Sequence, residues 1–276
     1  MKQKIVDAAA KAFSAHIERE LRHGGQKYVA QAKVDSKTVV LKIVELLPPN
    51  ADVALERAKR EVGLLRRIDS PRVVKIEAEL AELGAAPDGV AWLERYLDGT
   101  DLWDQLGVQW PWTETARMCD QVAEGLEAIH AAGAVHRDLS PGNIRCLNSG
   151  DYVVMDPGLA RHLLRTTVTG LFEPGTPGYL SPEHVSPVAR CTPASDVFSL
   201  GVLMYQALSG DVPIPVTADP AEYSRALRTS NAPSIGQARP DLTPEQQALV
   251  DTCLQRQAAR RYLDATELRT SLRSVR

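Results

Sequence analysis

The sequence predicts an α+β protein in two parts, a small strand-rich N-terminal part followed by a larger helical part. Three observations carry this prediction. Strand-like alternation and β-branched runs fall before about residue 100, helical periodicity dominates after it, and a single charged helix interrupts the strands. The length of 276 residues exceeds the common domain size, so one large domain or two lobes is expected.

The N-terminal elements follow from apolar spacing and from turn residues. Apolar side chains from Ile5 to Ile17 recur at helical spacing, whereas the stretch that begins at Tyr28 alternates and then becomes β-branched. Asp-Ser-Lys and Asp-Ser-Pro sequences interrupt the patterns. The expected elements are a helix over 4–17, strands over 28–33 and 38–44, a helix over 54–68, and strands over 73–83 and 90–97.

Beyond residue 100 the pattern is helical. Residues 97–100 form the expected connector between the two parts. The expected helices cover 114–132, 194–208, 220–229, 244–255 and 263–274.

Composition excludes several classes of protein. A net charge of −3 gives no electrostatic reason to expect nucleic acid or an anionic membrane as partner. No apolar run reaches the roughly 18–20 residues of a membrane helix, and the start lacks a signal-peptide pattern. The cysteines are scattered without metal-ligand spacing, which favours reduced thiols: Cys119, Cys146, Cys191 and Cys253. We therefore expect a cytoplasmic protein.

Three motifs in the second part have the residue types that phosphoryl transfer requires. The sequence HRDLSPGN covers residues 136–143, and Asp156-Pro157-Gly158 follows a strand-like stretch. The sequence GTPGYLSPE then ends at Glu183 and precedes an apolar helix that begins with SDVFSLG. Phosphoryl transfer needs a metal to neutralise charge, a cation on the phosphates and a carboxylate to orient the attacking hydroxyl.

These motifs, in this order, resemble the eukaryotic-type (Hanks-type) Ser/Thr protein kinase family, and the chain resembles a bacterial member. VVLK at 39–42 and REV at 60–62 match the strand and the helix that precede the catalytic loop in that family. The resemblance runs from about residue 17 to residue 272. It implies a bilobal fold, with a helical extension over 1–16, an antiparallel N-lobe over 17–97 and a helical C-lobe over 98–276.

The resemblance also implies catalytic roles. Lys42 would bridge the α- and β-phosphates of ATP, held by an ion pair with Glu61. Asp138 would act as catalytic base on the substrate hydroxyl. Asn143 and Asp156 would coordinate Mg²⁺, a hard cation that prefers oxygen ligands.

The implied ATP site is unusual for the family. Asp101 is placed to bind the ribose, although a surface charge is the alternative. Glu94 falls at the back of the adenine pocket and Arg145 where an apolar floor residue is expected, so each must find a partner or turn outward. The expected ATP-binding residues are Gly24, Gly25, Val29, Lys42, Glu61, Glu94, Tyr96, Asp101 and Arg145.

Other positions depart from the family pattern. The phosphate-covering loop keeps only the middle glycine, Gly24, of GxGxxG. Ser140 replaces the lysine typical of Ser/Thr kinases, which removes a cation from the phosphoryl group. Pro157 replaces an aromatic residue. Thr176 still favours Ser/Thr over Tyr and would position the substrate.

Regulatory and structural roles complete the resemblance. Arg137 would pair with a phosphorylated activation loop, whose candidate sites are Thr166, Thr167 and Thr169; the alternative is that these are polar loop residues. Asp196 would cap the catalytic-loop backbone, and Glu183 would pair with Arg261. The remaining histidines are interpreted as surface or packing residues: His16, His23, His130, His162 and His184.

The function that this resemblance implies is ATP- and Mg²⁺-dependent transfer to Ser or Thr of a protein substrate, with autophosphorylation and a regulatory partner as further options. A catalytically weak, nucleotide-binding kinase-like module is the alternative, because of the departures at the glycine loop, Ser140 and Pro157. A small-molecule phosphotransferase is the lesser alternative, since GTPGYLSPE is typical of a platform for protein substrates.

Overall fold

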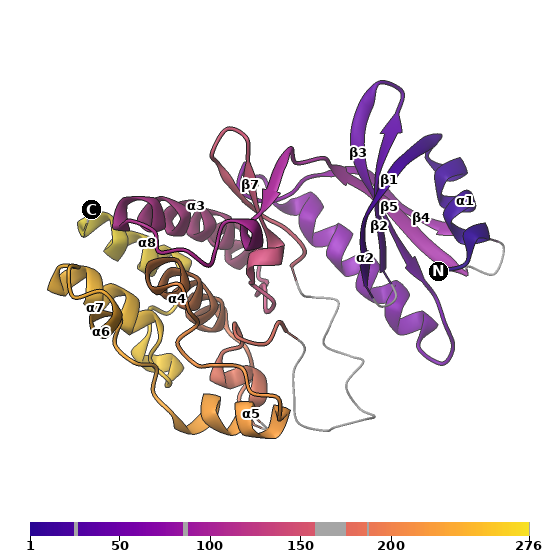
Figure 1. The fold of residues 1–276 in the computed structure, drawn as a ribbon. Helices are drawn as coiled ribbons and strands as arrows, with labels where there is room; N and C mark the ends of the chain where they lie inside the picture. Colours follow the sequence, from indigo (N-terminus) through magenta and orange to yellow (C-terminus); the bar gives the residue numbers. More distant parts are fainter. Residues whose placement is uncertain (25–26, 85–87, 158–174, 187, 276) are drawn as a thin grey trace. The chain divides into compact units, whose positions relative to one another are not determined.

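The computed structural model describes residues 1–24, 27–84, 88–157, 175–186 and 188–275 (Figure 1). The candidate residues Gly25, Thr166, Thr167 and Thr169 lie outside this description. The chain divides into two compact units, one of Met1–Ile68 with Val74–Asp98 and one of Asp69–Val73 with Gly99–Arg276. The elements form an α+β fold, with an antiparallel sheet in the first unit and mainly helices in the second.

The first unit is a five-stranded antiparallel sheet with strand order β1-β2-β3-β5-β4. Its strands are β1 (Ala15–Gly24), β2 (Lys27–Val34), β3 (Lys37–Glu45), β4 (Ile76–Leu83) and β5 (Gly89–Arg95). Its helices are α1 (Gln3–Ala12) and α2 (Ala51–Arg67). The strands predicted for β2, β3, β4 and β5 and the helix predicted for α2 are confirmed to within a few residues.

Helices α1 and α2 pack against opposite faces of this sheet (Figure 1), because successive side chains of a strand point to alternate faces. On one face Leu41 and Leu93 pack with Ile5 and Ala9 of α1. On the other face Trp92 packs with α2 in a second apolar cluster. Both faces are therefore covered, which explains why successive residues at the centre of β3 and along nearly all of β5 are buried.

The N-terminal helix is shorter than its apolar spacing predicts. It ends at Ala12, and Ser14 adopts a left-handed conformation with φ 50° that turns the chain into β1. Ile17, predicted as helical, lies instead in β1 opposite Ala32. Strand β1 has little apolar alternation of its own, so its pairing with β2 decides its conformation.

The second unit combines a three-stranded antiparallel sheet of order β6-β7-β8 with a set of helices. The strands are β6 (Gly99–Asp101), β7 (Ile144–Leu147) and β8 (Tyr152–Val154). The α-helices are α3 (Trp112–Ala131), α4 (Pro193–Ser209), α5 (Pro220–Thr229), α6 (Ile235–Ala238), α7 (Pro244–Cys253) and α8 (Ala265–Ser274). The short 3₁₀ helices are η1 (Leu102–Asp104), η2 (Pro141–Asn143), η4 (Pro182–Val185) and η5 (Ala258–Arg260).

Helix α4 forms the centre of the second unit because nearly all its residues are buried. Thr192 and Ser195 form a capping box at its start, and Gly210 ends it in a left-handed conformation with φ 91°. At Gly201 an added Cβ would lie 2.5 Å from Cβ of Cys253, so only glycine permits this approach of α7 to α4. The buried helix thereby fixes the loops that adjoin its first turn.

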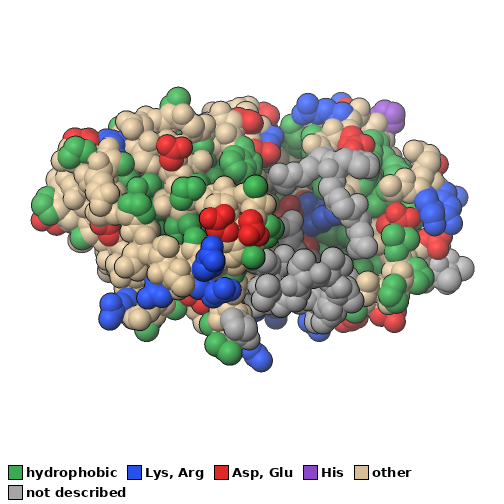
Figure 2. All heavy atoms as spheres, turned by 60° about the horizontal axis from the view of Figure 1, so that its bottom comes forward, with side chains coloured by type: hydrophobic (Ala, Val, Ile, Leu, Met, Phe, Trp, Pro, Cys, Tyr) green, Lys and Arg blue, Asp and Glu red, His purple; other side chains and the backbone are tan. Residues whose placement is uncertain are grey.

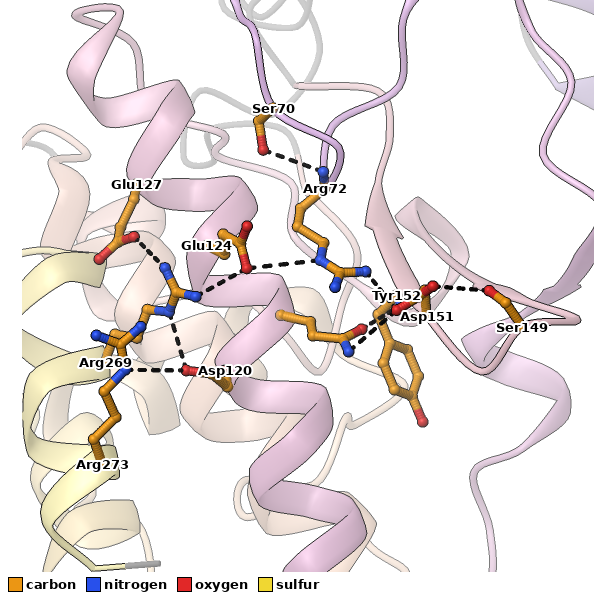
Figure 3. Close-up of polar contacts among 11 residues, drawn as sticks. Ser70, Arg72, Asp120, Glu124, Glu127, Ser149, Asp151, Tyr152, Arg269 and Arg273 are labelled. Atoms are coloured by element: carbon orange, nitrogen blue, oxygen red, sulfur yellow. Dashed lines mark hydrogen bonds and ion pairs between the residues drawn. The ribbon is translucent and has the colours of Figure 1, made fainter.

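Helix α8 is held to α3 by one arginine and three carboxylates (Figure 3). Asp120, Glu124 and Glu127 lie on one face of α3, since their spacing is four and then three residues. The Arg269 guanidinium lies 3.0 Å from Asp120, 2.9 Å from Glu124 and 2.7 Å from Glu127. The side chain is only 14% exposed, so these ion pairs are poorly screened by solvent.

The same group of charges continues to the short segment Asp69–Val73 (Figure 3). Arg72 lies 2.7 Å from Asp151 and 3.7 Å from Glu124. Its backbone N–H donates to the Ser70 hydroxyl at 3.1 Å. These contacts explain why this segment groups with the second unit, although its neighbours in sequence belong to the first.

The charged surface has no single dominant sign on the face shown. Figure 2 shows acidic and basic side chains interspersed there, in agreement with the net charge of −3. Among the described residues, none of the helices has both the length and the apolar character required to cross a membrane.

Candidate active site

A buried carboxylate of α4, that of Asp196, accepts hydrogen bonds from the backbone of the loop at residues 136–143. Asp196 accepts the backbone N–H of His136 at 2.7 Å and that of Arg137 at 2.8 Å, and it lies 2.9 Å from Nε2 of His130. Burial alone would raise the pKa of Asp196, but the bond to His130 and the surrounding positive potential hold that pKa below its usual range. The predicted capping role of Asp196 is confirmed.

The backbone turns sharply at Arg137, beside the two N–H groups that Asp196 accepts. Arg137 has φ 67°, a left-handed value that is unfavourable for a residue with a Cβ. Its carbonyl accepts a bond from Nε2 of His184 at 2.7 Å, and Nδ1 of His184 accepts from the Ser181 backbone N–H at 3.1 Å. Contacts on both sides therefore maintain the strained turn that precedes Asp138.

Asp138 is buried and held at both carboxylate oxygens. Oδ1 accepts the backbone N–H of Thr176 at 2.9 Å and its hydroxyl at 3.0 Å, and Oδ2 accepts Nδ2 of Asn143 at 3.2 Å. Nδ2 of Asn143 also donates to the Asp138 carbonyl at 2.7 Å. The structure thus brings three predicted site residues together around one carboxylate.

Asn143 ends η2 just before β7, and Asp156 follows β8, the strand that pairs with β7. The Asn143 carbonyl accepts the backbone N–H of Met155 at 2.8 Å, which places Asp156 one residue farther along. Nδ2 of Asn143 is used by Asp138, so Oδ1 is the atom that this amide can offer to a cation. An amide oxygen together with the Asp156 carboxylate is a donor set that fits Mg²⁺.

Asp156 itself adopts a left-handed conformation with φ 49°. The neighbouring Met155 carbonyl accepts Nε2 of His136 at 2.9 Å, so the catalytic loop fixes the backbone that leads into this residue. Pro157, which follows, is buried. Arg137 and Asp156 thus place two strained residues in the same small region, a distribution typical of functional sites.

Ser140 has a structural position in the loop. It is 3% exposed, and its carbonyl accepts the backbone N–H of Asn143 at 2.9 Å as η2 begins. Its short neutral side chain provides no cation. The Ser140 backbone therefore takes part in the loop, although the lysine of the family pattern is missing.

Arg145, which was expected to find a partner or turn outward, forms an ion pair in the three-stranded sheet. Arg145 and Asp101 lie opposite each other in the β6–β7 pairing, and Nη1 of Arg145 is 2.8 Å from Oδ1 of Asp101. The arginine side chain is 20% exposed and the aspartate 37%. Two predicted ATP-site residues are thus paired with each other.

In the first unit the predicted Lys42–Glu61 ion pair is replaced by two other pairs. Nζ of Lys42 lies 2.7 Å from Glu94, and both side chains are almost fully buried. Glu61 is instead bonded to Lys27 at 2.9 Å. The correction has a physical cause, because Glu94 is a buried carboxylate on the strand beside Lys42 and requires a cation of its own.

The other predicted nucleotide residues of the first unit lie on neighbouring strands. Val29 on β2 is the register partner of Lys42 on β3, and Gly24 pairs with Lys27 at the end of the β1–β2 hairpin. Tyr96 follows β5, and its hydroxyl is 3.5 Å from Arg19, a distance too long for a strong bond.

The predicted ion pair between Glu183 and Arg261 is also present. Arg261 donates to both carboxylate oxygens of Glu183, with both distances 2.9 Å. Burial would raise the pKa of Glu183, but the bidentate bonds to Arg261 hold that pKa below its usual range. Glu183, the last residue of the GTPGYLSPE motif, is therefore attached to Arg261 in the segment between η5 and α8.

Sequence reasoning missed three residues of these networks. His130 and His184 were interpreted as surface or packing residues, but both are buried or nearly so and bonded to the catalytic-loop scaffold. Lys27, which pairs with Glu61, was not among the predicted site residues. Spacing gave no signal for the histidine contacts, whereas the acid at position 94, which was expected to find a partner or turn outward, was a signal for an ion pair in the first unit.

A five-stranded antiparallel sheet with one main helix, followed by a helical unit that presents an aspartate and an asparagine on a buried loop, defines the protein kinase fold. The sequence comparison agrees, because the protein kinase domain profile matches residues 16–271. The chain belongs to the protein kinase family.

Its relatives include bacterial Ser/Thr kinases. Serine/threonine-protein kinase pkn3 of Myxococcus xanthus is 30% identical over 96% of this chain and 50% of its own length. Serine/threonine-protein kinase drp72 of Corynebacterium efficiens is 31% identical over 92% and 49%, respectively. PknL of Mycobacterium tuberculosis is 36% identical over 56% and 38%. The chain therefore spans about half the length of pkn3 and drp72.

Proposed function

We propose that this chain transfers the γ-phosphoryl group of ATP to Ser or Thr hydroxyls of a protein substrate, with Mg²⁺. The observation that carries the proposal is the Asp138 carboxylate, which is oriented by bonds from Thr176 and Asn143. The relatives named as Ser/Thr kinases support the choice of acceptor. Thr176 supports the same choice.

The proposed chemistry assigns one task to each group. Asp138 orients the substrate hydroxyl and accepts its proton as the oxygen bonds to phosphorus and the bond to ADP breaks. Asn143 and Asp156 would hold Mg²⁺, which supplies positive charge to the phosphates when bound. Lys42 would donate to the α- and β-phosphates, and Asp101 is proposed for the ribose.

A catalytically weak, nucleotide-binding module remains the second candidate. The observation that favours it is the pairing of Lys42 with Glu94, together with the neutral Ser140 in place of a cation. Both features reduce the positive charge that is available to a transferring phosphoryl group.

Labelling distinguishes the candidates. The protein is incubated with γ-labelled ATP and Mg²⁺, with a generic protein substrate or with a panel of small hydroxyl compounds. We expect label on protein, recovered as phosphoserine or phosphothreonine after acid hydrolysis. Measurable ATP binding without transfer would support the weak module, and label only on a small molecule would support a small-molecule phosphotransferase.

Regulation by the activation loop is a separate proposal. Thr166, Thr167 and Thr169 are the candidate phosphosites, and Arg137 is the candidate partner for the phosphate. Mass spectrometry after incubation with ATP should find phosphate on at least one of these threonines. A fully active protein that carries no modification there would exclude this form of control.

A further inference from the structure

Two lysine–glutamate pairs lie on the α2-facing side of the sheet in the first unit. The register places Lys42 opposite Trp92, and residues two apart along a strand share a face, so Lys27 and Glu94 lie on that same face. Glu61 reaches them from the buried side of α2. Four charges and one indole ring therefore occupy one largely buried layer, with only Lys27 partly exposed.

Glu94 uses both of its carboxylate oxygens. Oε2 lies 2.7 Å from Nζ of Lys42, and Oε1 accepts the indole N–H of Trp92 at 2.9 Å. Trp92 is completely buried, and the side chains of Lys42 and Glu94 are 4% and 3% exposed. A carboxylate fixed at both oxygens gives its lysine partner a defined position.

Lys27 forms the second lysine–glutamate pair of this network. It lies 2.9 Å from Glu61 and 5.3 Å above the centre of the Trp92 ring. Trp92 thus contacts one pair through its N–H and the other through its ring face. The two pairs are linked by a single rigid side chain.

The two carboxylates are close enough to compete for the same cation. An oxygen of Glu61 lies within 4.8 Å of an oxygen of Glu94. If Lys42 moved to Glu61, the buried ion pair between Lys42 and Glu94 would be broken, which is costly. Lys27 removes the need for that move because it neutralises Glu61 itself.

We propose that Glu94 is the residue that positions Lys42 in this chain, with Trp92 orienting Glu94 and Lys27 occupying Glu61. Its importance for nucleotide rests on the proposed function, since Lys42 is the proposed phosphate ligand. An ammonium group has three N–H donors, so a lysine anchored by one carboxylate can still donate to phosphates. Glu94 is a positioning residue, because it acts through Lys42.

The direct test asks which carboxylate stabilises the charged form of Lys42. The nucleotide-free protein is labelled with ¹³C at lysine Cε and titrated by NMR, with Lys42→Arg and Lys27→Arg to assign the two signals. Glu94→Gln and Glu61→Gln are the matched variants, because each removes one charge and keeps the side-chain shape.

Removal of the paired carboxylate destabilises the ammonium, so its lysine must titrate at lower pH. We expect Glu94→Gln to lower the pKa of Lys42 by about one unit or more, and Glu61→Gln to shift Lys27 more than Lys42. A shift of Lys42 in Glu61→Gln, with none in Glu94→Gln, would overturn the proposal.

Shorter substitutions provide the test if an amide variant does not fold. Glu94→Asp and Glu61→Asp keep the charge but withdraw the carboxylate by one methylene group. The Lys42 signal should respond to Glu94→Asp alone; a response to Glu61→Asp alone overturns the assignment. Because no nucleotide is present, the result does not depend on whether the protein transfers phosphate.

Discussion

At the residue scale, the Asp138 carboxylate depends on its neighbours for orientation. Thr176 provides two of the bonds that it accepts, one from the backbone and one from the hydroxyl. The motif sequence predicts that these residues share a site, and the structure shows the bonds that join them. It also shows that the Ser140 carbonyl accepts a backbone bond within the loop.

The Thr176 hydroxyl gives a prediction of its own. Thr176→Val keeps the shape and the backbone bond but removes the hydroxyl bond to Asp138. A lost bond to a charged group is worth about 1.5–3 kcal/mol, so we expect kcat to fall roughly ten- to 150-fold with little change in KM for ATP. Steady-state kinetics measure both constants.

Thr176→Ser is the matched control, since it restores the hydroxyl. Activity within a fewfold of the original protein is expected for this variant. Equal losses in the valine and serine variants would indicate that the methyl group matters and that the hydroxyl bond does not.

At the element scale, the motif residues, the long strands and the two scaffold contacts that the resemblance implied, made by Asp196 and Glu183, could be predicted, but the other contacts between elements could not. The β2–β3 hairpin was predicted from alternation and turn residues. Strand β1 was missed because Ala15–Gly24 is mostly polar and is defined by its partner. The Lys42–Glu94 pair was also missed, since ion pairing depends on which buried charges share a face.

The attachment of α8 to α3 can be tested by removing one guanidinium. Arg269→Met leaves Asp120, Glu124 and Glu127 close together on α3 without their shared cation (Figure 3). Loss of one partner from a largely buried ionic cluster costs about 3 kcal/mol or more, so a clear decrease in Tm is expected in a thermal melt.

Arg273→Met is the matched control for that variant. Arg273 is 56% exposed and lies 3.8 Å from Asp120, so its removal should change the free energy of unfolding by less than about 1 kcal/mol. Similar losses of stability in both variants would contradict the central position of Arg269 in the cluster.

At the scale of the whole molecule, acid stability should depend on buried carboxylates. Glu183 and Asp196 both have pKa values below their usual range in the folded protein. A depressed folded pKa contributes stability above the unfolded value, and that contribution is lost as the pH falls through the folded value. These two groups therefore favour acid unfolding beginning below about pH 4.

Arg261→Met tests the Glu183 part of this dependence. At pH 7 the variant leaves Glu183 buried without its bidentate partner, which should cost about 3–5 kcal/mol in urea denaturation. The difference from the original protein should shrink toward pH 3, where Glu183 is increasingly protonated. Arg260→Met, at an exposed position, should show neither effect; a cost for Arg261→Met that does not vary with pH would contradict the account.

The central claim is that Asp138 supports phosphoryl transfer to Ser or Thr, and Asp138→Asn tests it most directly. The asparagine keeps the size of the side chain but cannot accept the proton. Label transfer from γ-labelled ATP to a protein substrate is measured beside ADP affinity. We predict transfer reduced at least about a hundredfold with ADP affinity unchanged. Transfer at an undiminished rate in Asp138→Asn would contradict the claim.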